Sequence, residues 1–336
     1  MIFLWLLLGV FAVSWVLTLV LRRYALTRSL MDIPNERSSH SVPIPRGGGV
    51  AIVLAFTLAL PLASGLGLLG SNELYSLLGA GLLVAVIGFA DDHGHIAARW
   101  RLVGHFIAAT WALFWLNGLA PVEFVGINVD LGWFGNILAA VYLVWMLNLY
   151  NFMDGIDALA SAEAITVCLG MALVYWCSGH IELVWPPFIL AAAVAGFLWW
   201  NFPPAQIFMG DAGSGFLGAV LAGLTLIGGR SAPELLWSGV ILLGVFIVDS
   251  TWTLISRLLH GEKVYIAHSN HAYQHAARLY SSHKVVTFTV IIINTLWLIP
   301  ISLLVGLKII DGLTGLAIGY LPICYLVWKF KSGRSC

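Results

Sequence analysis

Long apolar runs, each about the length needed to cross a bilayer, follow one another along the chain. A helix needs roughly 20 residues to cross about 30 Å of hydrocarbon, and this window identifies about eleven candidate spans. They lie near residues 2–21, 48–69, 74–90, 102–119, 133–150, 159–178, 184–201, 214–229, 235–256, 285–306 and 311–328. The pattern predicts an all-α, polytopic integral membrane protein in which residues 1–336 form a single transmembrane domain.

The composition supports a membrane protein over a soluble one. Hydrophobic residues make up 60% of the chain and charged residues 10%, whereas soluble proteins carry about 25% charged residues. This composition excludes a soluble enzyme, a secreted disulfide scaffold and a disordered chain. The net charge of zero gives no reason to expect nucleic acid as a partner. The four cysteines lack metal-ligand spacing.

The basic residues predict the orientation. When the loops are numbered alternately, all but two of the 16 Lys and Arg residues fall on one side, with Arg230 and Lys308 opposite. The positive-inside rule makes the rich side cytoplasmic, which places the N-terminus in the periplasm and the C-terminus in the cytoplasm. The predicted cytoplasmic loops lie near 22–47, 91–101, 151–158, 202–213 and 257–284. They carry the acids Asp91, Asp92, Asp154, Asp157 and Asp211.

Two adjacent carboxylates end the third predicted span, in the sequence VIGFADDHGHIAARWR. Asp91 and Asp92 repel each other, and a position near lipid adds a desolvation penalty. A divalent metal is the simplest compensating charge, and Arg99 and Arg101 are local substitutes. The alternative interpretation is a solvated helix end.

A second polar cluster lies in NLYNFMDGIDALA, residues 148–160. Asp154 and Asp157 are three positions apart and share one face of a helix, and Asn148 and Asn151 precede them on nearly the same stripe. Helix capping accounts for one of these acids, but not for all four polar groups.

A glycine-rich turn follows in NFPPAQIFMGDAGSGFLG, residues 201–218. Glycines before a helix let the backbone approach a ligand, and helix N-termini attract phosphate. Asp211 in this turn is well placed only if it holds a metal that bridges to a diphosphate. A tight connection without ligand is the alternative.

The loop 257–284 concentrates polar side chains that suit phosphate binding. It contains His268, His271, Tyr273, Gln274 and His275 within eight positions. The loop has no cysteine and no HExxH spacing, so hydrogen-bond donors to phosphate are favoured over a zinc site. An interfacial helix decorated with histidines is the third interpretation.

The first cytoplasmic loop, DIPNERSSHSVPIPRGGGVAIV (residues 32–53), is rich in proline and glycine and is predicted to be ordered but not helical. Arg37, His40 and Arg46 are candidates for contact with an anionic lipid head group. A basic loop that serves only topology is an equal alternative.

The set ADDHGHI, NFMDGIDALA, FMGDAGS and HSNHAYQ, in this order, resembles the polyprenyl-phosphate N-acetylhexosamine-1-phosphate transferases, or glycosyltransferase 4 family. The PNERSSHSVPIPRGGGVAIV and HAYQ segments most resemble the bacterial branch that initiates O-antigen. The cell-wall translocase of the same family usually has a run of histidines where this chain has HAYQ.

The resemblance implies roles for individual residues. Asp91 is expected to deprotonate the lipid phosphate, with Asp92 beside it near the metal. Asp211 is expected to bind Mg²⁺, or alternatively Mn²⁺. His271 is expected to act in the catalytic loop and, with Tyr273 and Gln274, to steady the diphosphate or sugar.

The nucleotide pocket is expected to be formed by Asn151, Asp154 and Asp157, with Asp154 near the uracil, and Asn201 is expected to help place the same substrate. One departure concerns Ser269, where relatives commonly have Arg. A phosphate contact is then missing, or is supplied by Arg278 or Arg257.

The implied reaction transfers N-acetylhexosamine-1-phosphate from a UDP-sugar to undecaprenyl phosphate in the bacterial inner membrane. UMP is released, and O-antigen or related envelope polysaccharide synthesis begins. UDP-GlcNAc and UDP-FucNAc- or QuiNAc-like donors stay open, as does a homodimer.

Two other protein classes remain as alternatives. A secondary transporter is also polytopic, but its ionisable groups lie near the midplane, where this chain offers only Glu163, Asp249 and His105. A UbiA-type prenyltransferase also uses aspartate pairs with Mg²⁺, but its acidic motifs have a different spacing and lack FMGDAGS.

Overall fold

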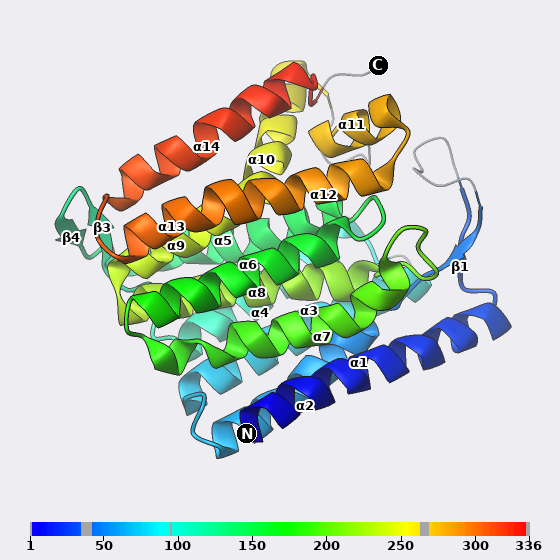
Figure 1. Ribbon diagram of the computed structural model, residues 1–336, viewed down its shortest axis with the longest axis horizontal. Coiled ribbons are helices and arrows are strands. Elements are labelled where there is room, and N and C mark those ends of the chain that lie inside the picture. The colour runs from blue at the N-terminus through cyan, green and yellow to red at the C-terminus, as the bar shows by residue number, and fades with distance from the viewer. Residues whose placement is uncertain (1, 35–41, 95, 263–268, 334–336) are drawn as a thin grey trace.

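Helices that lie side by side make up most of the protein (Figure 1). The computed structural model describes residues 2–34, 42–94, 96–262 and 269–333. The first half contains α1 (Ile2–Thr27), α2 (Val50–Gly65), α3 (Ser71–Gly94), α4 (Ala98–Trp115), α5 (Gly132–Met153), α6 (Leu159–Cys177) and α7 (Trp185–Asn201). The second half contains α8 (Asp211–Ser231), α9 (Pro233–Leu242), α10 (Gly244–Leu259), α11 (Ala272–Tyr280), α12 (His283–Ile293), α13 (Ile299–Gly306) and α14 (Gly312–Lys329).

The prediction of an all-α polytopic membrane protein is confirmed. Among the described residues, eight helices are long and apolar enough to cross a membrane, and the bent pair α9–α10 makes a ninth if it is one span. The eleven predicted spans all coincide with helices, but α2 has only 16 residues, and α4 begins with Arg99 and Arg101, which lower its hydropathy. The count of eleven and the orientation therefore stay predictions.

Small elements outside the long helices were not predicted. Strands β1 (Met31–Asp32) and β2 (Ile44–Pro45) pair antiparallel in the first loop, and β3 (Val122–Phe124) pairs with β4 (Ile127–Val129). A 3₁₀ turn, η1 (Ile181–Leu183), precedes α7, and a π-helical turn, η2 (Asn294–Leu298), joins α12 to α13. The loop 257–284 contains α11, so it is helical over nine residues.

Helix α8 forms the centre of the molecule. All residues from Ala212 to Gly229 are buried, and α3 and α5 both pack against α8. Glycines permit this close packing: a Cβ on Gly88 of α3 would lie 2.6 Å from the backbone carbonyl of Asp211, and one on Gly218 would lie 2.5 Å from the carbonyl oxygen of Met146. These contacts hold α8 closely against α3 at its first residue and against α5 further along.

The helix α10 departs from the common direction. The axis bends by 69° between α9 and α10, and Figure 1 shows α10 running steeply across the bundle toward the end of α14. This bend brings the end of α10 beside α11 and α14, both of which it contacts.

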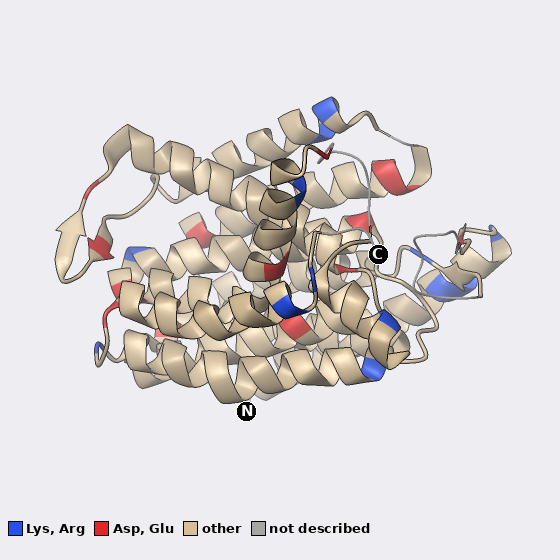
Figure 2. Ribbon diagram, turned by 90° about the horizontal axis from the view of Figure 1, so that it is seen from above, with Lys and Arg blue, Asp and Glu red and all other residues tan. Residues whose placement is uncertain are grey.

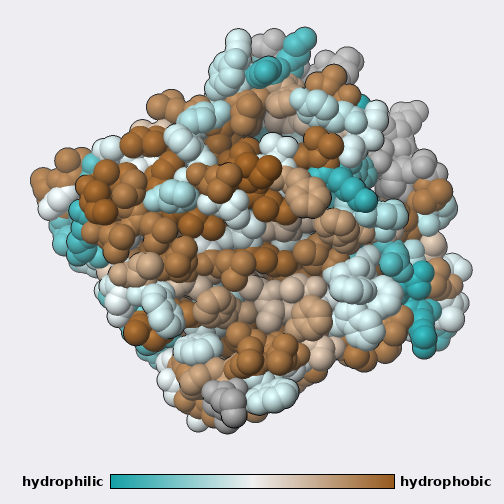
Figure 3. Space-filling view, in the orientation of Figure 1, coloured by the Kyte–Doolittle hydropathy of each residue, from teal (hydrophilic) through white to brown (hydrophobic). Residues whose placement is uncertain are grey.

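The surface has the distribution expected for a membrane protein. In Figure 3 brown apolar side chains cover the middle of the helices, and teal side chains gather toward their ends. In Figure 2 most of the blue Lys and Arg segments lie on the side that holds the C-terminus. Helices suit a bilayer because their backbone hydrogen bonds are made within each helix. Basic residues concentrated at one end of the bundle are typical of the cytoplasmic side of a membrane protein.

Candidate active site

A cavity of about 550 Å³ opens where α3, α4, α5, α8 and α11 meet. Its walls contain residues of several sequence motifs that are far apart along the chain. Of the predicted site residues, the lining includes Asp91, Asn151, Asp154, Asp211, His271, Tyr273 and Gln274.

Asp91 lies at the end of α3 with both carboxylate oxygens engaged. Oδ1 accepts a hydrogen bond from the backbone N–H of Ile96 at 2.7 Å, and Oδ2 forms an ion pair with Arg101. The same guanidinium nitrogen of Arg101 lies 3.9 Å from Oδ2 of Asp211. Arg101 is therefore a cation shared by two of the cavity's acids.

Asp211 is fixed at the first residue of α8 by a polar contact from α5. The Asn151 side-chain amide donates to Oδ1 of Asp211 at 2.8 Å and to the hydroxyl of Ser214 at 3.1 Å. Gly210 before it has a φ of 79°, a conformation that suits glycine. The glycine-rich turn thus aims a carboxylate at the cavity.

Asp92 lies behind Asp211 rather than in the cavity wall. The backbone N–H of Ala212 donates to Oδ2 of Asp92 at 3.4 Å, so this carboxylate sits at the N-terminus of α8. Arg46 donates from Nη2 to the backbone oxygen of Asp92 at 2.6 Å. Arg46 consequently ties the loop between α1 and α2 to the end of α3.

Asp154 follows the last residue of α5 and carries a perturbed carboxyl. Burial raises its pKa to about 7, and the negative charges of Asp211 and Asp92 act in the same direction. The neutral form of this carboxyl is therefore favoured, mainly because the side chain is buried.

The donor set fits a hard divalent cation such as Mg²⁺. Within the described residues no group of three or more His, Cys, Asp or Glu side chains is arranged to hold a metal. Mg²⁺, however, commonly takes only one or two carboxylates together with water and substrate phosphates. Asp211 and Asp92 supply two neighbouring carboxylates at the N-terminus of α8, and carboxylate oxygens are ligands that Mg²⁺ prefers.

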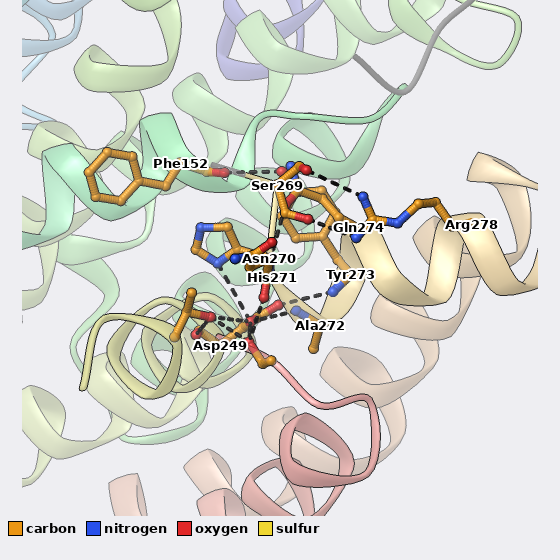
Figure 4. Close-up of polar contacts among 11 residues, drawn as sticks. Phe152, Asp249, Ser269, Asn270, His271, Ala272, Tyr273, Gln274 and Arg278 are labelled. Atoms are coloured by element: carbon orange, nitrogen blue, oxygen red, sulfur yellow. Dashed lines mark hydrogen bonds and ion pairs between the residues drawn. The ribbon is translucent and has the colours of Figure 1, made fainter. Parts of the chain in front are cut away.

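A buried acid outside the motifs, Asp249, contacts residues 269–275, which contain His271 and His275 and are called the histidine loop below (Figure 4). Asp249 of α10 is 3% exposed and accepts hydrogen bonds from the backbone N–H groups of Ala272 at 2.9 Å and Tyr273 at 3.1 Å. Its Oδ1 lies 3.6 Å from Nδ1 of His271. Asp249 therefore caps α11 and holds His271, whose other face lines the cavity.

The capping box of α11 makes this arrangement rigid. The backbone N–H of His271 donates to Oε1 of Gln274 at 3.1 Å, and the hydroxyl of Tyr273 donates to the backbone oxygen of Phe152 at 3.0 Å. Gly155 makes room for Tyr273, because a Cβ there would lie 2.1 Å from the phenol oxygen. The start of α11 is thus held against the end of α5.

Comparison with known proteins shows the family of the chain. The family model for glycosyl transferase family 4 matches residues 74–229. A decaprenyl-phosphate N-acetylglucosaminephosphotransferase of Mycobacterium tuberculosis (strain ATCC 25618 / H37Rv) is 30% identical over 295 residues, which cover 79% of this chain and 72% of the relative. The chain belongs to the polyprenyl-phosphate N-acetylhexosamine-1-phosphate transferase family.

Two further relatives extend the match. A probable undecaprenyl-phosphate N-acetylglucosaminyl 1-phosphate transferase of Bacillus subtilis (strain 168) is 27% identical, with coverage of 90% of this chain and 89% of the relative. A phospho-N-acetylmuramoyl-pentapeptide-transferase of Shouchella clausii (strain KSM-K16) is 27% identical, with coverage of 73% and 79%. These proteins confirm the family resemblance inferred from the motifs.

Two residues that the resemblance assigned to the nucleotide pocket of this transferase lie outside the cavity lining. Asp157 accepts from the backbone N–H of Ala205 at 3.0 Å and lies 3.2 Å from Nδ1 of His283. Asn201 accepts from the backbone N–H of Ala158 at 3.0 Å. Both side chains hold neighbouring loops together, and their expected role in nucleotide binding stays a prediction.

The substitute cations proposed for Ser269 also lie away from the cavity lining. Arg278 donates to the backbone oxygen of Ser269 at 2.7 Å, and Arg257 pairs with Glu262 at 2.7 Å. The cation that does line the cavity of this transferase is Arg101. The predicted contacts of Arg37, His40 and His268 fall outside the described residues.

Asp249 is the residue that sequence reasoning missed. It had been noted only as an acid within an apolar run, where a charged group is costly unless it is paired. The available signal was that run, 235–256, followed by a loop rich in polar donors. The pairing itself depends on the bend between α9 and α10.

Proposed function

We propose that the protein transfers N-acetylhexosamine-1-phosphate from a UDP-sugar to undecaprenyl phosphate and releases UMP. An oxygen of the lipid phosphate attacks the sugar-linked phosphorus, the bond between the two phosphates of the donor breaks, and the electron pair leaves with UMP. The observation that carries this proposal is the cavity in which Asp91, Asp154 and Asp211 meet Arg101 and His271 at one end of the helix bundle.

The residues of the cavity divide the tasks of binding and orientation. Asn151 holds Asp211 in place, and Asp211 with Asp92 would hold Mg²⁺. The metal, when bound, neutralises the diphosphate charge that develops as the bond breaks. His271, supported by Asp249, presents a ring nitrogen to the cavity and donates to a phosphate oxygen or the sugar.

Arg101 connects substrate binding to the base assigned to Asp91. The guanidinium of Arg101 pairs with the carboxylate of Asp91, so this carboxylate is engaged until Arg101 moves. An incoming diphosphate offers Arg101 a stronger bidentate partner. Binding of the donor then releases Asp91 to accept a proton from the lipid phosphate.

The proposed donor and pathway rest on the sequence of the loop before α11. HAYQ at residues 271–274 resembles the branch that initiates O-antigen, so we favour UDP-GlcNAc or a FucNAc- or QuiNAc-like UDP-sugar and the start of an envelope polysaccharide. Multiple apolar helices support a multi-pass protein of the bacterial inner membrane. The Bacillus subtilis relative is described as acting on undecaprenyl phosphate and N-acetylglucosamine 1-phosphate.

The test separates binding from turnover in three isosteric variants. Asp211→Asn is expected to lower kcat by orders of magnitude, because a metal ligand is lost. Asp91→Asn is expected to abolish turnover while UDP-sugar still binds. Asp154→Asn is expected to raise KM for the donor more than it lowers kcat. Calorimetry measures the affinity for the donor, and UMP release measures turnover. Equal loss of donor binding in all three variants would refute the assigned roles.

A further inference from the structure

A second hollow lies between α10 and α14, apart from the cavity described above. It has a volume of about 620 Å³, and its apolar walls include Trp252 and Ile255 of α10 and Trp328 of α14. Because α10 bends by 69° away from α9, it diverges from the bundle here and meets α14 near the ends of both helices (Figure 1). The side chain of Trp328 is 60% exposed.

One end of this groove is cationic. Lys329 and Lys331 line it and are exposed, and His260 lies in the same lining. Among the described residues that line the groove there is no Asp or Glu. An apolar trough with two lysines at its mouth matches an amphiphile with a hydrocarbon tail and a negative head group.

We propose that the groove between α10 and α14 binds an anionic phospholipid, with the acyl chain along Trp252 and Trp328 and the phosphate at Lys329 and Lys331. A phospholipid is favoured over the polyprenyl-phosphate acceptor because the lining of the groove shares no residue with the lining of the cavity. A phosphate held by these lysines is not at the acids that would act on it.

The groove is coupled to the histidine loop through the turn after α14. Ser332 lines the groove, and its hydroxyl donates to Oδ1 of Asp249 at 3.0 Å. The backbone N–H of Gly333 donates to the backbone oxygen of Asn270 at 2.7 Å. A phospholipid that orders this turn therefore also orders Asp249, which caps α11 and holds His271.

Native mass spectrometry of the purified full chain tests the site. The probes are phosphatidylglycerol, phosphatidylcholine of the same chain length, and undecaprenyl phosphate. We expect the wild-type protein to retain phosphatidylglycerol over phosphatidylcholine. The double variant Lys329→Gln/Lys331→Gln is expected to bind it about 25-fold more weakly, since each lysine near an anionic lipid contributes roughly a factor of five.

The control removes the same charge elsewhere on the predicted cytoplasmic side. Arg23→Gln/Arg28→Gln at the end of α1 is expected to bind phosphatidylglycerol as the wild type does. Equal weakening in both double variants, equal retention of the two phospholipids, or displacement of phosphatidylglycerol by stoichiometric undecaprenyl phosphate would each overturn the proposal.

The coupling has its own readout, which does not depend on catalysis. Phosphatidylglycerol is expected to slow amide hydrogen exchange in residues 269–280 of the wild type by at least about threefold, and to leave the lysine double variant unchanged. Ser332→Ala is expected to keep lipid binding but lose the change in exchange. Unchanged exchange in the lipid-bound wild type would contradict the coupling.

Discussion

Replacement of Asp249 by Asn removes one charge from the centre of the histidine loop without changing its shape. The carboxylate accepts from Ala272 and Tyr273, from the hydroxyl of Thr253 at 3.2 Å and from that of Ser332 at 3.0 Å. An amide has a single acceptor oxygen, so its NH₂ group must face some of these donors. At least one charge-assisted hydrogen bond is lost.

The expected effect on stability is modest, and that on turnover is larger. Hydrogen bonds to charged groups contribute roughly 1.5–3 kcal/mol each, so Asp249→Asn should destabilise the fold by about 2 kcal/mol and lower the melting temperature by a few degrees. His271 also loses the carboxylate that holds it 3.6 Å away. A displacement of about 1 Å can reduce a rate on the order of 100-fold, so we expect kcat to fall by roughly that factor while donor KM changes less than about threefold.

Two matched variants separate positioning from simple destabilisation. Asp311 caps α14 by accepting from Leu313 and Thr314, both at 3.1 Å, with no histidine beside it, so Asp311→Asn should leave kcat within about twofold of wild type. Thr253→Val removes one donor to Asp249 and should lower stability by about 1 kcal/mol with little change in kcat. The assay is UMP release with thermal unfolding in parallel. A kcat for Asp249→Asn that falls no further than that of Thr253→Val would refute the positioning role.

The remaining predictions concern the metal, the orientation and the titration of Asp154. Chelation with EDTA should abolish UMP release and Mg²⁺ or Mn²⁺ should restore it; full turnover in EDTA would exclude the metal at Asp211 and Asp92. A reporter fused after residue 336 should be cytoplasmic, and reporters at Asn72 and His180 periplasmic; a periplasmic C-terminal reporter would show a miscounted span. Because the folded protein raises the pKa of Asp154 from 3.8 to about 7, it binds more protons than the unfolded chain between these values. The stability of the metal-free protein should therefore fall as pH rises from about 4 to 7, and Asp154→Asn should flatten this fall; an equal slope in both proteins, measured by thermal unfolding, would show that another group titrates.

The sequence was sufficient to predict the helices because lipid imposes a simple requirement on the backbone. Apolar runs near 20 residues coincide with helices throughout the described chain, and in two cases, near 235–256 and 285–306, with a helix that is bent or interrupted. Run length does not reveal such breaks. Local hydropathy likewise could not show that α2 is short or that Arg99 and Arg101 begin α4.

The candidate site was predictable in its parts but not in its connections. The motifs identified Asp91, Asp154, Asp211 and His271 because charged or polar groups near lipid require a partner. All four line one cavity. They could not distinguish a side chain that faces the cavity from one that holds a loop. Asp157 instead accepts from the backbone N–H of Ala205, a contact 48 residues distant in sequence.

The partners of Asp249 also could not be predicted from the sequence. Asp249 contacts residues 23 and 24 positions later, in the next described helix, a pairing that no local pattern encodes. An isolated acid in an apolar run indicated only that a partner must exist.

Release of UMP from a panel of UDP-sugars by the purified protein tests the proposed function most directly. With undecaprenyl phosphate present, we predict UMP from UDP-GlcNAc or from a FucNAc- or QuiNAc-like UDP-sugar. Without the lipid, or in Asp211→Asn, release should fall to background. No UMP from any UDP-N-acetylhexosamine, or equal release with and without undecaprenyl phosphate, would contradict transfer of a sugar phosphate to the lipid.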